Sequence, residues 1–160
     1  DDINRMSSSI NYKERALASF LTAEILILNK DYKSAVSTYI SAINENPNIG
    51  LYWGYCSQVL NTHLNFDPFM SLYFIQNAIN LDPKNPRWSF IKGQIISKII
   101  FFEADNEWKF KSWLRQYEKE MSAALVKCHS EQVALKQAIL LFVNMLDKKF
   151  NNASNILANG

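Results

Sequence analysis

Cysteine and histidine are the residues of this sequence with the chemistry to bind a metal ion. Cys56 and His63 fall on one face of a predicted helix, but seven residues separate them, a rise of ~10 Å. Zinc–ligand bonds measure only ~2.0–2.3 Å, so one ion cannot reach both side chains. Cys128 and His129 are adjacent and point about 100° apart around a helix. We therefore expect buried thiols and half-exposed imidazoles, with no metal site and no cofactor.

Motifs for covalent catalysis or phosphate binding are missing as well. The sequence has no Gly-x-Ser-x-Gly elbow, and its four glycines leave little from which to build a phosphate loop. Paired carboxylates such as Glu118 and Glu120 are predicted to lie on a solvated helix face. We therefore expect that the protein is not an enzyme.

Basic and aromatic residues alternate in one segment, a pattern that would suit phosphate contact and base stacking. These residues are Trp108, Lys109, Phe110, Lys111, Trp113 and Arg115. At helical spacing, however, a core stripe emerges: Phe110, Trp113, Leu114, Tyr117, Met121 and Leu125. The opposite face carries mixed charge: Lys111, Arg115, Glu118, Lys119 and Ser122. An amphipathic helix accounts for both sets, and the net charge of +2 is small, so we do not expect nucleic acid as a partner.

The composition is that of an ordinary globular protein, with 48% apolar and 20% charged residues in a chain of 160. No Pro- or Ser-rich linker interrupts it, which predicts one domain, and no stretch of ~18 apolar residues predicts a membrane span. The two cysteines do not require an oxidising compartment. We expect a cytoplasmic protein, or a periplasmic or secreted one if a leader before Asp1 is removed.

Apolar residues recur at spacings of three and four almost throughout, which predicts an all-α fold. The predicted helices cover about 10–29, 32–45, 49–63, 68–81, 86–102, 106–127 and 131–149. Their predicted N-caps include Asp31, Asp67, Asn85, Asp105 and Ser130. Two of these caps precede a proline, which strengthens the start signal.

A repeat is visible in the turns. Pro47 and Pro83 lie 36 residues apart, and each follows a similar sequence at the predicted end of a helix. Small and bulky residues recur at matching distances from these prolines: Ala23, Leu26, Ala35, Tyr39 and Ala42, then Trp53, Ser57, Leu60, Ser71, Ile75 and Ala78, then Gly93 and Ile96. Small residues let paired helices approach, and bulky ones fill the space beside them. The pattern resembles the tetratricopeptide repeat (TPR), a 34-residue helix-turn-helix unit.

The resemblance covers about 16–102 and is incomplete. Two extra residues fall near Leu64 to Asp67, Trp88 is one residue out of register, and 105–149 depart from the motif. It implies antiparallel helix pairs stacked in a right-handed superhelix, within a single domain over 1–150. The repeats would cover about 16–49, 50–85 and 86–127. Two longer helices would cap the C-terminal end, the last of them at 131–149, and a frayed tail would follow at 151–160.

In TPR proteins the first helix of each pair lines a concave groove that holds a partner segment. The matching residues here are Leu17, Phe20, Glu24, Leu51, Tyr55, Gln58, Arg87, Ile91, Gln94 and Lys98. Alternatively, some of them pack on each other or on the terminal helices. The resemblance thus implies a protein-interaction module, an adaptor, scaffold or chaperone, whose protein partner presents one or two hydrophobic anchors. We expect no small-molecule substrate.

Some TPR domains grip the C-terminal carboxylate of heat-shock chaperones with a basic and amide clamp. The matching positions are Phe20, Glu24, Tyr55, Arg87 and Ile91. Only Arg87 fits, and Glu24 would repel a carboxylate. We therefore do not expect a chaperone-tail adaptor.

Two further interpretations stay open. The length and the apolar groove are similar to those of the small TPR chaperones that hold translocators for type III secretion. The segment Ala138-Ile139-Leu140-Leu141-Phe142-Val143 is apolar on all sides of its helix, so it must be buried. Burial inside the chain is the expectation, and a self-assembling structural or secretion-machinery component, forming a homo-oligomer through 138–143, is the alternative.

Overall fold

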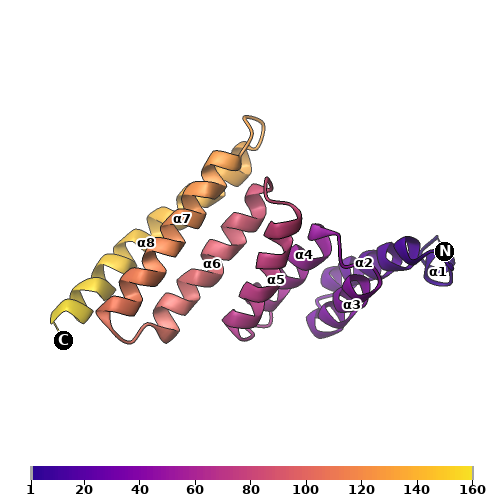
Figure 1. The fold of residues 1–160 in the computed structure, drawn as a ribbon, viewed down its shortest axis with the longest axis horizontal. Coiled ribbons are helices and arrows are strands. Elements are labelled where there is room, and N and C mark those ends of the chain that lie inside the picture. The colour runs from indigo at the N-terminus through magenta and orange to yellow at the C-terminus, as the bar shows by residue number, and fades with distance from the viewer. Residues whose placement is uncertain (1, 160) are drawn as a thin grey trace. The chain divides into compact units, whose positions relative to one another are not determined.

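The computed structural model describes residues 2–159, which form eight α-helices and no strand (Figure 1). The helices are α1 (Asp2–Ser7), α2 (Tyr12–Leu28), α3 (Tyr32–Glu45), α4 (Gly50–Thr62), α5 (Pro68–Leu81), α6 (Pro86–Glu103), α7 (Glu107–Lys127) and α8 (Val133–Asn159). The all-α prediction is confirmed, and only the short α1 was not predicted. The chain divides into two compact units, 1–83 and 84–160, which are described separately. The predicted single domain over 1–150 stays a prediction.

Unit 1 contains two helix pairs, α2 with α3 and α4 with α5, and α3 also packs on α4. Small residues lie where the repeat predicts close helix contacts: Ala23, Ala35, Ala42, Ser57, Ser71 and Ala78 are all 0% exposed. Ser57 on α4 donates a hydrogen bond of 2.7 Å to the backbone oxygen of Ser71 on α5. The size pattern in the sequence therefore reflects the packing of the pairs.

In unit 2, α6 packs on α7 and α7 on α8. Phe150 of α8 contacts rings from both other helices, with centroids 5.2 Å from Phe101, 6.3 Å from Phe110 and 4.9 Å from Tyr117. Glu120 of α7 forms an ion pair of 3.1 Å with Lys92 of α6, and both side chains are largely buried. Glu120 therefore does not lie on a solvated face as predicted, whereas Glu118 is exposed.

Three of the five predicted helix caps are confirmed. The side chains of Asp31, Asp67 and Asn85 accept backbone N–H bonds of 3.3, 3.0 and 3.0 Å at the starts of α3, α5 and α6. The other two predictions are wrong. At α7 the cap is Asn106, which accepts from the Lys109 N–H at 2.9 Å, and α8 begins only at Val133, beyond Ser130.

The last helix is longer than predicted. A frayed tail was expected from residue 151, but α8 runs to Asn159. Phe150, only 4% exposed, anchors α8 against α6 and α7 just beyond the predicted end at 149. No proline follows to stop the helix, so it continues past this anchor.

Candidate partner-binding surface

The first helices of the two pairs in unit 1, α2 and α4, carry six of the predicted contact residues. Phe20 is at the centre of an aromatic cluster, with ring centroids 5.9 Å from Tyr39, 5.1 Å from Tyr52 and 6.0 Å from Tyr55. Because Phe20 is only 8% exposed, its ring joins α2, α3 and α4 and offers little surface to a partner. It therefore acts as a packing residue, which is the alternative left open for single positions.

Two leucines on these helices do face solvent. Leu17 on α2 and Leu51 on α4 are 40% and 39% exposed. Tyr55 and Gln58, on the same face of α4 as Leu51, are half-buried. The face of α2 and α4 thus presents exposed leucines beside a rigid aromatic base, an arrangement suited to apolar anchors of a peptide segment.

Glu24, also on this face, is held from within the unit. The Tyr39 hydroxyl on α3 donates a hydrogen bond to its carboxylate. Burial, and then the neighbouring Glu24 carboxylate, raises the pKa of Tyr39. The side chain of Glu24 is therefore oriented by α3, and its carboxylate opposes binding of an anionic segment on this face.

In unit 2, α6 carries the remaining four predicted contact residues. Arg87 is exposed, Gln94 and Lys98 are half-buried, and Ile91 is only 2% exposed, so Ile91 packs in the core. Lys98 borders a hollow of about 350 Å³ between α6 and α8, which also involves Phe101, Phe102 and Lys149. Burial lowers the pKa of Lys98. Sequence reasoning missed this hollow. The sequence feature that could have indicated it is the pair of adjacent phenylalanines near the end of α6, Phe101 and Phe102. Both side chains are exposed in the structure.

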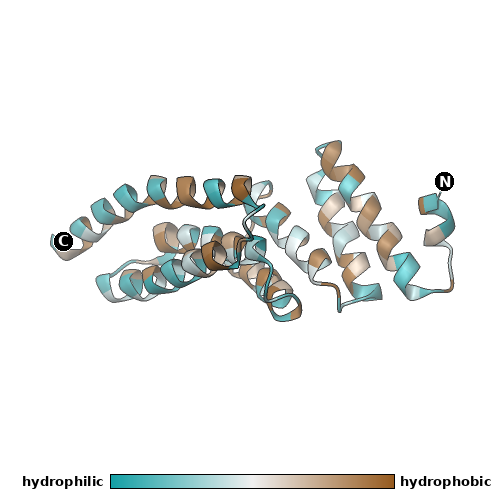
Figure 2. Ribbon diagram, turned by 90° about the horizontal axis from the view of Figure 1, so that it is seen from above, coloured by the Kyte–Doolittle hydropathy of each residue, from teal (hydrophilic) through white to brown (hydrophobic). Residues whose placement is uncertain are grey.

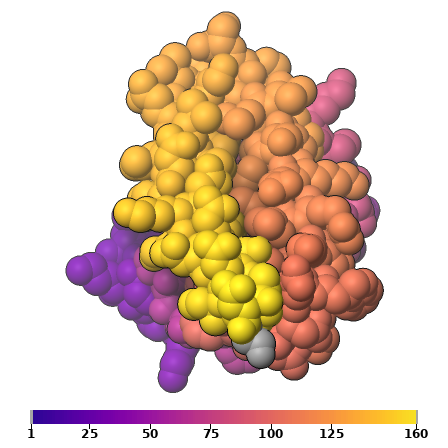
Figure 3. All heavy atoms as spheres, turned by 90° about the vertical axis from the view of Figure 1, so that its left-hand side faces the viewer, coloured from indigo at the N-terminus to yellow at the C-terminus, as the bar shows by residue number. Residues whose placement is uncertain are grey.

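The apolar segment 138–143 on α8 is not buried as a whole, contrary to expectation. Ile139 is 0% exposed, and the ring centroids of Phe142 and Phe90 lie 5.7 Å apart. Leu140 and Leu141, however, are 42% and 63% exposed. Figure 2 shows hydrophobic residues concentrated in the first half of α8. In Figure 3, α8 lies at the surface beside α7. One side of α8 therefore packs in unit 2, and the other offers apolar surface.

The residues considered for chemistry are dispersed. Cys56 is fully buried, while His63 is exposed and stacks on Tyr32 with ring centroids 4.1 Å apart. Within residues 2–159, no group of three or more His, Cys, Asp or Glu is arranged to hold a metal ion. Over the same residues, no helix has the length and apolarity needed to cross a membrane.

The basic and aromatic residues that were considered for nucleic-acid binding lie on α7, which is an amphipathic helix. On α7, Phe110 and Tyr117 are 2% exposed, whereas Arg115 and Lys119 face solvent. Lys111 forms an ion pair of 2.8 Å with Glu107. The basic residues of this segment are thus partly neutralised by neighbours on their own helix.

The antiparallel helix pairs of this chain, with small residues buried at their contacts, are similar to the fold of solved structures. The fold is that of tetratricopeptide-repeat helix pairs. The Arabidopsis OM64 TPR domain matches with a TM-score of 0.63 and 14% sequence identity, over 80% of this chain and 93% of that chain. A chain of the CopN–Scc3 complex matches with a TM-score of 0.63 and 15% identity, over 89% of this chain and 86% of that chain. The sequence itself matches no family model and has no significant match among curated proteins.

The predicted contact residues all lie on α2, α4 and α6. These are the first helices of their pairs, and each presents residues spaced by three and four along one side. The burial of their side chains divides these residues into two groups. Leu17, Leu51 and Arg87 are exposed, whereas Phe20 and Ile91 belong to the packing.

Proposed function

We propose that this chain is a protein-interaction module that binds a partner segment on the first helices of its TPR-like pairs. The observation that carries the proposal is the exposure of Leu17 and Leu51 beside the packed rings of Phe20, Tyr52 and Tyr55. A rigid base limits the entropy lost when a partner binds, and exposed apolar side chains supply the area that binding removes from water. A role as adaptor, scaffold or chaperone is compatible with this surface.

The preferred partner segment is apolar and not acidic. Glu24 lies on the same face as Leu17 and keeps its carboxylate oriented through Tyr39. A partner carboxylate placed there would meet like charge. We therefore propose one or two large apolar anchors, such as Leu or Phe, in the segment that contacts unit 1.

The test compares partners captured from a native host lysate and identified by mass spectrometry. The bait is either the wild-type chain or the double variant Leu17→Asp/Leu51→Asp. Val126→Asp is the matched control, because Val126 is 85% exposed and lies on α7, a helix that carries none of the predicted contact residues. A partner captured by wild type and control but lost with the double variant supports the proposal. Equal capture by all three baits contradicts it.

The aromatic residues give a second measurement with the identified partner. Tyr55→Ala should weaken binding by about 1–3 kcal/mol while helix content is kept, because Tyr55 is half-buried on this face. Phe20→Ala should instead destabilise the chain by about 3–5 kcal/mol, because Phe20 is buried. Calorimetric titration and circular dichroism separate the two effects.

One observation favours self-association as a second candidate function. Leu140, Leu141 and Met145 on α8 are 42%, 63% and 56% exposed, and they lie within one and a half turns of each other. Two copies joined through this surface would remove it from water. Sedimentation equilibrium should then show a dimer that Leu141→Asp dissociates and that Leu17→Asp/Leu51→Asp leaves intact; a wild-type monomer at all concentrations would exclude this role. The type III secretion chaperone interpretation requires capture of a translocator protein in the lysate experiment.

A further inference from the structure

A second hollow in unit 1 lies outside the predicted partner face. Its volume is about 540 Å³, and seven of its eight lining side chains are apolar. Val36 and Ile40 come from α3, Met70 and Phe74 from α5, and Leu60 from α4. We refer to it as the α3–α5 groove, since the second helices of the two pairs contribute most of it.

The connection between α4 and α5 adds an aromatic side chain to this groove. The backbone N–H groups of Leu64 and Phe66 donate to the oxygens of Val59 and Leu60 at 3.1 and 3.0 Å, which ties the loop to the end of α4. Asn65 between them has a φ of 48°, in the left-handed region that turns the chain. The two residues that exceed the repeat period fall in this loop. The departure from the TPR pattern thus supplies Phe66, which lines the groove and is 53% exposed.

The groove is apolar and open to solvent. Ile40 and Met70, from the two helices that contribute most to it, are 37% and 43% exposed. A small ligand is usually enclosed over most of its surface, whereas this groove leaves its lining side chains partly exposed. An amphipathic helix fits such a site, because it inserts apolar residues spaced at i, i+3 or i+4 and i+7 and keeps its other side in water.

The charge at the groove points to the chemistry of the occupant. Lys33 is the one charged residue that lines the groove, and it is exposed. In the part of the chain that the structure describes, Lys33 forms no ion pair. A carboxylate beside the apolar face of a bound helix would meet this cation at the edge of the groove.

We propose that the α3–α5 groove binds an amphipathic helix of a partner protein that carries a carboxylate next to its apolar face. This site is separate from the face of α2 and α4, and its preferred charge is opposite, since Glu24 disfavours acidic segments there. The two sites would let one chain hold two partner segments of different chemistry.

The experiment uses a phage-displayed library of 20-residue helical peptides, randomised on one face and selected on the full chain. Wild type should enrich peptides with apolar residues at helical spacing and an adjacent Asp or Glu. Lys33→Glu should reverse the preference from Asp or Glu to Lys or Arg, whereas Lys13→Glu, the same charge change on α2, should leave it acidic. Met70→Glu should weaken the affinity for the selected peptides by about tenfold or more, whereas Leu28→Glu should leave that affinity unchanged.

The outcomes that overturn the proposal are distinct. Enrichment of no peptide, or of peptides that bind Met70→Glu as tightly as wild type, would show that the groove does not bind helices. Saturable binding of dodecanoate at the groove without peptide enrichment would assign it to a small amphiphile, and a wild-type dimer dissociated by Met70→Glu would assign it to a second copy. Peptides that lose binding to Leu17→Asp/Leu51→Asp but not to Met70→Glu would support the proposed function and overturn this inference.

Discussion

A Cβ atom added to Gly93 on α6 would lie 2.5 Å from the Cε atom of Met121 on α7. Both residues are buried, and Met121 is 3% exposed. The missing side chain at residue 93 therefore sets how closely these helices of unit 2 approach. The sequence placed Gly93 at a small site of the third, incomplete repeat, and the contact with Met121 gives that site a physical cause.

Enlarging residue 93 should destabilise unit 2. Gly93→Val should lower the free energy of unfolding by about 1–3 kcal/mol, because its methyl groups would overlap the Met121 side chain. Gly93→Ala should cost less, since the flexible end of Met121 can move and alanine gains up to about 1 kcal/mol in helix propensity. Urea denaturation of both variants measures the difference. If Gly93→Val is as stable as wild type, the helices do not meet as closely as described.

Two buried tyrosines should respond in opposite ways to loss of the hydroxyl group. The Tyr117 hydroxyl is buried and has no hydrogen-bond partner among the described residues, so Tyr117→Phe should stabilise the chain by about 1 kcal/mol. The Tyr39 hydroxyl donates to the Glu24 carboxylate, so Tyr39→Phe should destabilise it by about 1–3 kcal/mol. Thermal unfolding of the two variants side by side gives the comparison. Equal shifts in the same direction would contradict these hydrogen-bond assignments.

The helix pairs could be predicted because their signals are local. The spacing of Pro47 and Pro83 marks equivalent turns, and Ala35, Ala42 and Ala78 mark the contacts where only small side chains fit. Asp31, Asp67 and Asn85 act as caps because the groups they bind lie two or three residues away. Such features depend on few residues, so one sequence suffices to read them.

The exposure of individual site residues depends on longer-range packing. Periodicity put Phe20 and Leu17 on the same face of α2, but the rings of Tyr39, Tyr52 and Tyr55 cover Phe20 and leave Leu17 exposed. The α3–α5 groove combines residues more than 30 positions apart, from Val36 to Phe74, so no local pattern indicates it. The apolar segment 138–143 indicated burial without indicating which side of α8 would be covered.

Burial of Cys56 predicts a loss of stability in mild alkali. Burial raises the pKa of the Cys56 thiol to about 12, whereas a thiol in an unfolded chain has a pKa of about 8.5. Between these values the unfolded chain releases a proton that the folded chain keeps. The contribution of Cys56 is therefore complete below about pH 8.5 and decreases above it, by up to about 1.4 kcal/mol per pH unit.

Denaturant titrations between pH 7 and pH 9.5 measure this dependence. The range ends below the usual pKa of about 10 for tyrosine, so ionisation of tyrosines in the unfolded chain contributes little. Cys56→Ala is the control, because it removes the thiol while keeping a small apolar side chain at a site that is 0% exposed. The control should lose the alkaline decrease in unfolding free energy. The same decrease in wild type and Cys56→Ala would assign it to other groups.

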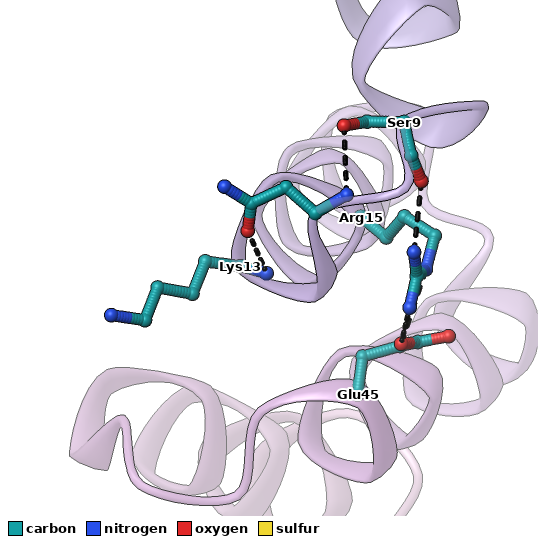
Figure 4. A network of polar contacts seen from close by, with 5 residues as sticks. Ser9, Lys13, Arg15 and Glu45 are labelled. Atoms are coloured by element: carbon teal, nitrogen blue, oxygen red, sulfur yellow. Dashed lines mark hydrogen bonds and ion pairs between the residues drawn. The ribbon is translucent and has the colours of Figure 1, made fainter.

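Arg15 on α2 joins three segments of unit 1, as Figure 4 shows. Its guanidinium donates to one carboxylate oxygen of Glu45 on α3, at 3.2 Å from Nε and 3.0 Å from Nη2, and to the backbone oxygen of Ser9 at 2.8 Å from Nη1. Both charged side chains are about a third exposed, at 33% and 38%. The contact with Ser9 holds the residues between α1 and α2 against the first helix pair.

Arg15→Ala should lower the free energy of unfolding by no more than about 1 kcal/mol, because partly exposed ion pairs are screened by water and salt. Its larger effect should be local. Amide hydrogens of α1 should exchange faster once Ser9 loses its partner, whereas Glu45→Gln, which keeps Arg15 and its bond to Ser9, should leave α1 protected. Hydrogen exchange followed by mass spectrometry of residues 2–9 distinguishes the two variants. Exchange that is equally fast in both variants would show that the ion pair orders this segment, and exchange as slow as in wild type in both would show that neither contact does.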